Sequence, residues 1–593
     1  MPSGIRGRGN PDYSSTEYAQ PWGGIDVSKP SSQIEPSCCV SLNGAIIRGG
    51  LTTGPNFITP PVGVSGTTVP PALSVGEVIC LISNLQGYTI LITNSGVWTD
   101  ISLTSPKAWS KAYTFPSGYP DTGTHFGSVI IGNDLYFSSS AALGVYQLAI
   151  AGSPAVATVT EISAQNGSGP FIGGDFLFTV ANRLCLWNII GGDGNQNVPT
   201  PSTSTHYPDR VAWSFPSAYG FFDPNAPITA GGFDQITEAR GLGTGAAVFE
   251  AVAMLAHNGG FTEMVPNING GNIEPFTFAP LWSADQGIVC RYGSMAQYGS
   301  MCCFLGFDQP YQLSPGGLTP VGNQIASLVQ NFSQWNDPTS YDSVYPASGI
   351  NASIVEIEGE KHYILGFASN ITPSTSRDTM FFDCNLTTNS WTTFDIPGFT
   401  QTCPVYQSYD TQAMDITGPP FGNIRRDNWL LVAGLVGAFT PQTCTLYQFV
   451  IGRQLVDNHT VTPAFTSSLI ALFRAETPLI NIPQTTRKVM VEYENLPALS
   501  ATPTVIGIEL FGQPLQGGYP NVGQTPVTNT FSVACPYYAS GSNVPSRAVL
   551  TAFSEPIGTA NTTLATSLQL TTAQPIRLIR VAIVAETTQG DQK

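Results

Sequence analysis

The hydrophobic positions of this chain fall in short apolar or alternating stretches, separated by turns rich in Gly, Asn and Asp. From Val75 onward such stretches recur in pairs and triplets: Val78–Ile82, Tyr88–Ile92 and Gly96–Trp98; Ser128–Phe137 and Gly144–Leu148; Gly174–Val180 and Arg183–Trp187; Met301–Phe304 and Tyr311–Leu313; Lys361–Leu365, Met380–Asp383 and Asn389–Trp391; Trp429–Val432 and Leu446–Phe449. Stretches of this length between turn residues predict antiparallel strands in hairpins and meanders.

The recurrence also predicts how these strands are grouped. Three of the closing strands carry Tyr-Gln before an apolar residue, at Tyr146, Tyr311 and Tyr447. A repeat of several tens of residues is typical of β-propeller blades, and residues 74–452 have room for about six or seven blades of roughly 50 residues. An array of β-sandwiches is the alternative. The best helix candidate, Ala246–Ala256, is Gly-rich at its start and better fits a buried pair of strands.

The two ends of the chain differ from this central part. Residues 1–20 are polar and predict a free arm, and residues 21–73 predict two extended pieces followed by a Pro/Gly-rich loop. After Gly452 the strands become longer, as in Arg487–Tyr493, Val505–Leu510 and Ile576–Val584. We therefore expect an all-β protein with an irregular β-propeller at 74–452 and a C-terminal β-sandwich at 455–590.

Composition narrows the classes of function. Charged residues make up 10% of the 593 residues, against roughly 25% in average soluble proteins, and a surface poor in charge suits a subunit packed in a large assembly. The net charge of −17 argues against stable binding of duplex nucleic acid. An acidic wall does suit a channel through which DNA slides, although solubility alone also explains acidity.

Targeting segments and disulfides are not expected. Met1 is followed by polar residues, and the long uncharged run at 49–76 is interrupted by Pro and Gly, so neither a secretory signal nor a membrane helix is predicted. The eleven cysteines are odd in number and scattered. They predict buried, reduced thiols in a protein made in a bacterial cytoplasm.

No catalytic, cofactor or metal site is predicted. Glu356, Glu358 and Glu360 lie around a hairpin and could in principle form a glycosidase pair, but charged hairpin edges are the commoner explanation. The five histidines lack metal-ligand spacing, and Gly191–Asn197 is one isolated copy of a calcium-loop pattern. Trp213, Trp282, Trp391 and Trp429 could line a sugar-binding surface, but such residues more often fill blade cores.

Four phrases, in this order, carry a resemblance to a known family. They are Trp22-Gly-Gly-Ile-Asp-Val-Ser-Lys-Pro30, Arg210-Val-Ala-Trp-Ser214, Ala230-Gly-Gly-Phe-Asp234 and Met301-Cys-Cys-Phe-Leu-Gly-Phe-Asp-Gln-Pro-Tyr-Gln-Leu313. The order resembles the β-propeller tail proteins of short-tailed bacteriophages, the nozzle or hub family. The residues that match its phrases are Trp22, Gly23, Gly24, Asp26, Arg210, Trp213, Ser214, Gly231, Asp234, Phe304 and Tyr311. Asp308-Gln-Pro-Tyr311 departs from the family's Asp-Gly turn, so the type of turn in this hairpin is in doubt.

The resemblance implies a virion structural protein, not an enzyme, with structural roles for these residues and an interblade ion pair for Arg210. It implies a homohexameric ring beside the portal, adaptor and other tail proteins, through which viral DNA passes without specific binding. Six copies at −17 each would bring about −102 formal charges to the ring. Contact of loops such as 191–208 with the host surface stays open. The alternatives are a glycan-binding fibre, spike or minor capsid protein, and a polysaccharide-acting propeller enzyme that uses Glu358.

Overall fold

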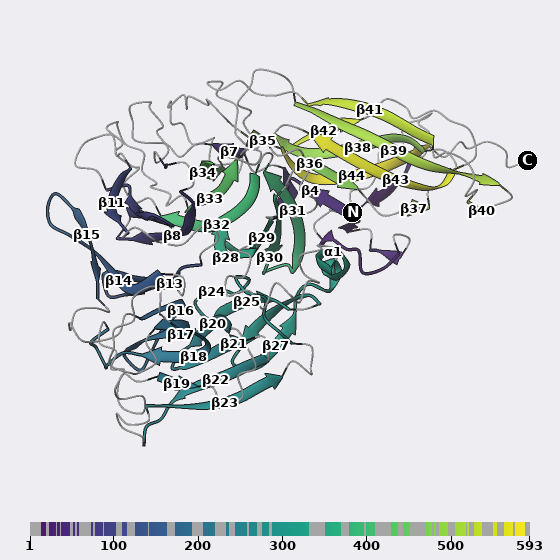
Figure 1. The fold of residues 1–593 in the computed structure, drawn as a ribbon. Coiled ribbons are helices and arrows are strands. Elements are labelled where there is room, and N and C mark those ends of the chain that lie inside the picture. Colours follow the sequence, from purple (N-terminus) through teal and green to yellow (C-terminus); the bar gives the residue numbers. More distant parts are fainter. Residues whose placement is uncertain are drawn as a thin grey trace, which may run out of the picture.

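The computed structural model describes a chain built almost wholly from strands (Figure 1). Backbone and side chains are described for residues 23–30, 33–35, 37–45, 47, 51, 73–74, 77–86, 88–101, 109–115, 125–139, 144–162, 173–189, 210–219, 243–257, 260–269, 275–281, 288–306, 308–329, 350–357, 359–366, 381–394, 444, 490–493 and 577–580, and the backbone alone for the other strand residues given below. Strands dominate this part, with η4 (Asn323–Ile325) and α1 (Ala326–Gln330) as short helical turns. The all-β prediction is confirmed.

Seven antiparallel meanders, here numbered 1 to 7, follow one another along the central chain. Meanders 1 to 3 consist of β8 (Ile79–Leu85), β9 (Tyr88–Thr93), β10 (Gly96–Thr99) and β11 (Ser110–Thr114); β12 (Gly127–Ile131), β13 (Asp134–Ser139), β14 (Ala142–Ala151) and β15 (Val156–Glu161); and β16 (Ile172–Val180), β17 (Arg183–Gly191), β18 (Thr205–Trp213) and β19 (Phe233–Gln235).

Meanders 4 to 6 repeat this arrangement. They consist of β20 (Gly243–Phe249), β21 (Val252–His257), β22 (Gly260–Pro266) and β23 (Phe276–Ser283); β24 (Ala296–Tyr298), β25 (Met301–Leu305), β26 (Pro310–Ser314) and β27 (Gly317–Pro320); and β28 (Ile350–Ile357), β29 (Glu360–Ala368), β30 (Thr379–Asn385) and β31 (Ser390–Ile396). The predicted strand pair within Ala246–Ala256 is confirmed as the β20–β21 hairpin.

Meander 7 draws strands from distant parts of the chain. Its order is β32 (Phe399–Tyr409), β33 (Asn428–Val436), β34 (Thr443–Val450), β7 (Asn56–Ile58) and β35 (Leu469–Ile470). The early strand β7 pairs with β34 through Ile58 opposite Gln448 and Asn56 opposite Val450. A strand from the first sixty residues therefore completes the last meander.

First strands of several neighbouring meanders contact one another. Contacts join β12 to β16, β16 to β20, β24 to β28, β28 to β32, and β32 of meander 7 to β8 of meander 1. In Figure 1 the meanders can be found in chain order, from purple β8 through teal β23 to green β34. The first strands therefore form two runs of neighbours, β12–β16–β20 and β24–β28–β32–β8.

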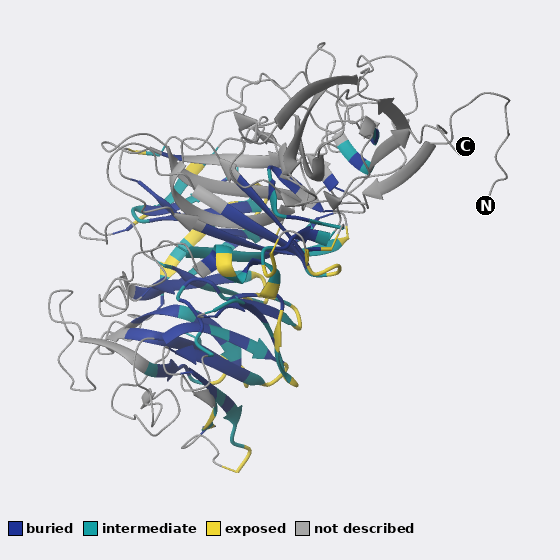
Figure 2. Ribbon diagram, turned by 90° about the vertical axis from the view of Figure 1, so that its right-hand side faces the viewer, coloured by how far each residue is buried: buried dark blue, intermediate teal, exposed yellow. Residues whose placement is uncertain are grey.

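The hydrophobic core lies between adjacent meanders and not within one of them. Leu85 and Ile90 of meander 1 pack with Phe137 and Tyr146 of meander 2. In the same way, Trp187 and Trp213 of meander 3 share a cluster with Leu255 of meander 4. Figure 2 shows these strands as buried ribbons stacked on one another. Since each sheet buries both faces, short apolar strands suffice for a large core.

Strands from the chain's two ends share sheets. The C-terminal strands are β36 (Phe473–Glu476), β37 (Ile480–Asn481), β38 (Thr486–Asn495), β39 (Thr504–Gln516), β40 (Tyr519–Pro520), β41 (Val527–Cys535), β42 (Val549–Phe553), β43 (Thr563–Thr572) and β44 (Ile576–Glu586). The N-terminal ones are β1 (Tyr13–Tyr18), β2 (Gly24–Ile25), β3 (Cys38–Cys39), β4 (Ser41–Asn43), β5 (Ala45–Ile47) and β6 (Leu51–Thr53). β4 lies between β31 and β36, and β6 pairs with β44, so the segment at 21–73 joins the C-terminal strands to meander 6.

The pairing of β1 differs from the free arm expected for residues 1–20. Tyr13 lies opposite Glu586 and Tyr18 opposite Val581, along the side of β44 that faces away from β38. An apolar strand with one unpaired side readily takes up another strand, because its backbone N–H and C=O groups need partners. The predicted boundaries at 20, 73 and 452 otherwise stay predictions.

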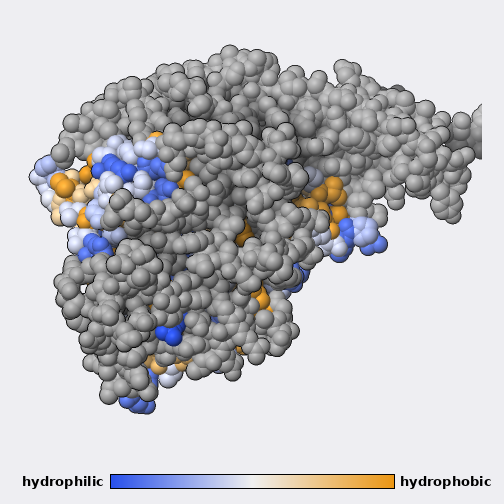
Figure 3. Space-filling view, viewed as in Figure 1, coloured by the Kyte–Doolittle hydropathy of each residue, from blue (hydrophilic) through white to orange (hydrophobic). Residues whose placement is uncertain are grey.

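On the described part of the face drawn in Figure 3, small apolar groups lie beside hydrophilic residues. Among the described residues, the exposed large apolar ones are Ile130 and Val156 in meander 2 and Ile268 at the β22–β23 turn. In the same part of the chain, no helix has the length and apolar character needed to cross a membrane.

Candidate functional site

The glycines of the first family phrase bring the N-terminal segment against meander 6. Gly24 has a φ of +76°, and a Cβ there would lie 2.5 Å from the carbonyl oxygen of Trp391. Nearby, Asp26 accepts hydrogen bonds from the N–H (2.9 Å) and hydroxyl (2.6 Å) of Ser28. Trp22 lies outside the described residues. The described residues of this phrase therefore hold the N-terminal segment close to the backbone of β31.

The second phrase lies on β18, in the core between meanders 3 and 4. Trp213 is buried and meets Phe276 edge to face, with ring centroids 5.5 Å apart. Ser214 is fully buried: its hydroxyl accepts from the N–H of Leu184 (3.0 Å), and its carbonyl oxygen accepts from Arg183 Nη1 (2.8 Å). The Trp213 side chain therefore packs in the core, and the Ser214 hydroxyl binds the backbone of β17.

The third phrase is placed beside the second by strand pairing. Asp234 lies opposite Val211, and Arg210 opposite Gln235, in the β18–β19 ladder. Arg210 is half-buried. Gly231 and the side chain of Asp234 lie outside the described residues, so the interblade ion pair expected for Arg210 stays a prediction.

We expect Ser214→Ala to lower the free energy of unfolding by about 1–3 kcal/mol, because the buried N–H of Leu184 would lose its acceptor. A urea titration monitored by tryptophan fluorescence measures this. Thr158→Ala, which removes an exposed hydroxyl from β15, is the control and should change the value by less than about 0.5 kcal/mol. Equal effects of the two substitutions would contradict the role assigned to Ser214.

The fourth phrase forms the β25–β26 hairpin, in which Phe304 lies opposite Tyr311 with their rings stacked 5.7 Å apart. The Tyr311 hydroxyl donates to Asp308 within the turn (3.0 Å), and the N–H of Gly306 donates to the carbonyl of Gln309 (2.8 Å). The sequence left the type of this turn in doubt, because Pro310 follows Gln309 where the family has an Asp-Gly turn. The hairpin forms nonetheless, with Pro310 as the first residue of β26.

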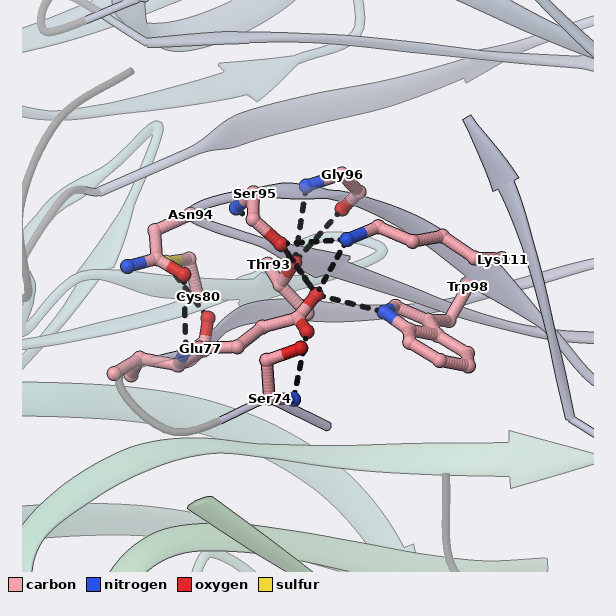
Figure 4. Close-up of polar contacts among 10 residues, drawn as sticks. Ser74, Glu77, Cys80, Thr93, Asn94, Ser95, Gly96, Trp98 and Lys111 are labelled. Carbon is pink, nitrogen blue, oxygen red and sulfur yellow. Dashed lines mark hydrogen bonds and ion pairs between the residues drawn. The ribbon is translucent and has the colours of Figure 1, made fainter. Parts of the chain in front are cut away.

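A polar cluster that the sequence did not reveal surrounds Glu77, just before β8 (Figure 4). One carboxylate oxygen, Oε1, accepts from Ser95 Oγ (2.5 Å), Thr93 Oγ1 (2.8 Å) and Trp98 Nε1 (2.8 Å). Lys111 Nζ, from β11, lies 3.1 Å from the same oxygen. The Glu77 side chain is 2% exposed, so it forms a buried carboxylate bound by several strands of one meander.

The hydrogen bonds decide the charge of Glu77. Burial alone raises the pKa of this carboxyl, but the hydrogen bonds from Ser95, Trp98, the backbone of Ser74 and Thr93 outweigh it and lower the pKa to about 2. Hydrogen bonds to the charged form favour that form. Glu77 is therefore a carboxylate throughout the ordinary pH range.

This charge makes the cluster unsuitable for nucleophilic catalysis. Lys111 Nζ lies 2.8 Å from Ser95 Oγ, a distance that a serine–lysine pair would need. In this arrangement Lys111 Nζ is the donor to both Ser95 Oγ and Glu77 Oε1, so it does not accept the serine's proton. Ser95 also donates its proton to Glu77. With a pKa of about 2, the Glu77 carboxylate is too weak a base to activate the Ser95 hydroxyl, so the arrangement instead ties Ser74 and Glu77 to meander 1.

The remaining candidate residues are separate from one another. Glu356 accepts from the Tyr298 hydroxyl (3.2 Å) and Glu360 from Asn385 (2.5 Å), while Glu358 lies outside the described residues. His362 and Asp383 form a buried pair with Nδ1 3.0 Å from the carboxylate. Within the described ranges, no three His, Cys, Asp or Glu side chains are grouped as metal ligands would be.

The described tryptophans and cysteines lie mainly in cores. Trp391 is fully buried and donates from Nε1 to the carbonyl oxygen of Val321 at 2.6 Å. The side chains of Trp282 and Trp429 lie outside the described residues. All the described cysteines are free thiols, and burial raises the pKa of Cys39 and Cys303 to about 12, which keeps these thiols protonated.

Neither a family model nor a curated protein matches the chain. Solved structures similar to it include the Neurospora crassa Pan2 WD40 domain, with 8% identity, a TM-score of 0.31, and coverage of 63% of this chain and 89% of that one. Another is a Trichoderma reesei carbohydrate-active enzyme of family AA12, with 12% identity, a TM-score of 0.29, and coverage of 66% and 98%. At such identities and TM-scores, these similarities carry no argument about what this chain does.

Proposed function

We propose that this chain is a structural subunit of a phage tail, a nozzle or hub protein that forms part of the conduit for DNA ejection. The observation that carries the proposal is the order of the four family phrases along residues 20–313. The described members of those phrases, such as Gly24, Trp213 and Phe304, lie at strand crossings and in cores. In a scaffold protein, we expect such phrases to lie at positions like these, where they hold the fold together.

The architecture proposed for this subunit is a closed propeller of the seven meanders, with a C-terminal β-sandwich beside it. The contacts of β12 with β16, β16 with β20, β24 with β28, β28 with β32, and β32 with β8 support closure. The pairing of β7 with β34 also supports it, because an early strand then completes the last blade. In a closed ring, each blade covers the faces of its neighbours.

The low charge and the acidity of the chain also support this role. A ring of six copies would carry about −102 formal charges, and negative walls repel phosphates, so DNA would slide without being held. The proposed neighbours are the portal, the adaptor and further tail proteins. The glycan-binding alternative gains no support from Trp213 and Trp391, which are buried.

The test is the copy number of this chain in purified particles of the phage that encodes it, measured by mass spectrometry against the major capsid protein. About six copies per particle are expected for a hexameric ring. A larger multiple of three would favour a fibre or spike, and absence from the particles would refute the structural role. Native mass spectrometry of the purified chain provides a second measurement of ring size.

A further inference from the structure

The segment Arg291–Met295, which connects meander 4 to meander 5, contacts first strands of several other meanders. The Tyr292 hydroxyl donates to Asp175 Oδ2 on β16 at 2.8 Å, and Asn188 donates to the same oxygen. The Tyr292 ring also lies 5.5 Å from the rings of Phe176 on β16 and His125, just before β12. One tyrosine of meander 5 therefore reaches meanders 2 and 3.

The next residues of the segment contact meanders 4 and 6. Gly293 has a φ of +77°, and a Cβ there would lie 2.5 Å from the carbonyl oxygen of Ile350, the first residue of β28. The Met295 side chain lies 3.0 Å from the position that a Cβ on Gly245 of β20 would take. Between them, the carbonyl oxygen of Ser294 accepts from the Tyr363 hydroxyl at 2.6 Å.

These contacts share one position in the fold. Ile350 is the first residue of β28, and His125 lies just before β12. Gly245 is the third residue of β20 and Asp175 the fourth of β16, so both lie in the first half of their strands. In the closed propeller proposed above, the first strands line a common centre, and their beginnings surround one end of it. A segment that contacts four meanders besides its own at that end lies across the centre.

We propose that Arg291–Met295 plugs one end of the propeller axis, with Tyr292 and Gly293 as the residues fitted against its wall. The plug is held from within meander 5 as well, because the N–H of Arg291 donates to Leu305 (2.9 Å) and the N–H of Leu305 donates to Ser294 Oγ (3.2 Å). Burial and the carboxylate of Asp175 raise the pKa of Tyr292 well above its usual value, so its hydroxyl remains a donor.

The plug has a consequence for transport that rests on the proposed function. A propeller surrounds a central channel, and a segment across one end closes that channel to DNA, peptides and polysaccharides. The conduit must then lie between copies of the chain and not along the axis of any one of them. The plug itself is independent of the virion role, since it concerns the isolated chain.

Hydrogen–deuterium exchange of the purified full-length chain tests the plug. In the wild type we expect residues 291–295 to exchange as slowly as the neighbouring strands, and far more slowly than the exposed turn at Ser314–Gly317. Gly293→Ala should displace the segment, because its Cβ has no room beside Ile350. Exchange in 291–295 should then become at least about tenfold faster.

The matched control is Gly299→Ala, in the turn after β24. Gly299 has a similar φ of +59°, but no atom lies within 4 Å of a Cβ built there. This variant introduces a similar backbone strain and should leave exchange in 291–295 unchanged. If Gly293→Ala does not fold, Tyr292→Phe decides, because loss of its hydroxyl should speed exchange in 291–295 and around Asp175.

Rapid exchange of 291–295 in the wild type would overturn the plug. Unchanged exchange in Gly293→Ala, or in Tyr292→Phe where that variant decides, would overturn it equally. None of these outcomes affects the copy number in particles. Failure of the plug and failure of the proposed function are therefore distinguishable.

Discussion

Trp391→Ala should lower the free energy of unfolding by about 3–5 kcal/mol, the range found when a fully buried aromatic residue is truncated. Its ring is wholly enclosed and lies 6.3 Å from that of Tyr363. Its Nε1 donates to Val321, and its backbone lies beside Gly24. The substitution would leave a cavity where the N-terminal segment, meander 5 and meander 6 meet, and differential scanning calorimetry or urea unfolding measures the loss.

Trp391→Phe separates volume from hydrogen bonding at this position, and Ile268→Ala is the control. Trp391→Phe keeps much of the volume but leaves the carbonyl oxygen of Val321 without its donor, which costs about 1–3 kcal/mol. Ile268→Ala removes an apolar side chain that is 95% exposed and should change stability by less than about 0.5 kcal/mol. A Trp391→Ala effect as small as that of Ile268→Ala would contradict the packing described here.

Glu77→Gln should destabilise the protein by about 3 kcal/mol at neutral pH, because the donors now directed at a carboxylate would face a neutral amide. The pKa of Glu77 is lowered from 4.5 to about 2 in the folded chain. The stability that this carboxylate contributes is therefore fully present above pH 4.5 and is lost as the pH falls towards 2. The difference between wild type and variant should shrink over that interval.

Urea unfolding at several pH values between 7 and about 2.5 measures this difference. Glu250→Gln is the control, since Glu250 is exposed at the β20–β21 turn and its substitution should change stability little at any of these pH values. A difference between wild type and Glu77→Gln that stayed constant from pH 7 to 2.5 would show that Glu77 is not the titrating group.

The sequence was sufficient for the local strands, since each predicted hairpin rests on residues close together in the chain. Ser128–Phe137 became β12 and β13, with the turn at Gly132 and Asn133 between them. Short apolar or alternating stretches on either side of a turn define such pairs, because each strand must bury one or both of its faces. Trp213 and Trp391 are buried in cores, as the sequence favours for tryptophans in such strands.

Contacts between distant segments were not predictable in this way. The partners of Glu77 lie at positions 74, 93, 95, 98 and 111, with no fixed spacing that marks them as a set. The contact of Tyr292 with Asp175 joins residues 117 positions apart. Such contacts depend on which sheets become neighbours, and the hydrophobic pattern of a single strand carries no information on that.

The pairing of β7 with β34 also has a consequence for synthesis on the ribosome. Ile58 is made 392 residues before Val450, which at 5–20 residues per second is a wait of roughly 20–80 s. During that time β7 has no partner strand. In the same way β4 awaits β31 and β36, and β6, which can pair with β5 at once, awaits β44 on its other side. The nascent chain therefore carries unpaired strands almost until translation ends, and an early stop would release a product with open sheet edges prone to aggregation.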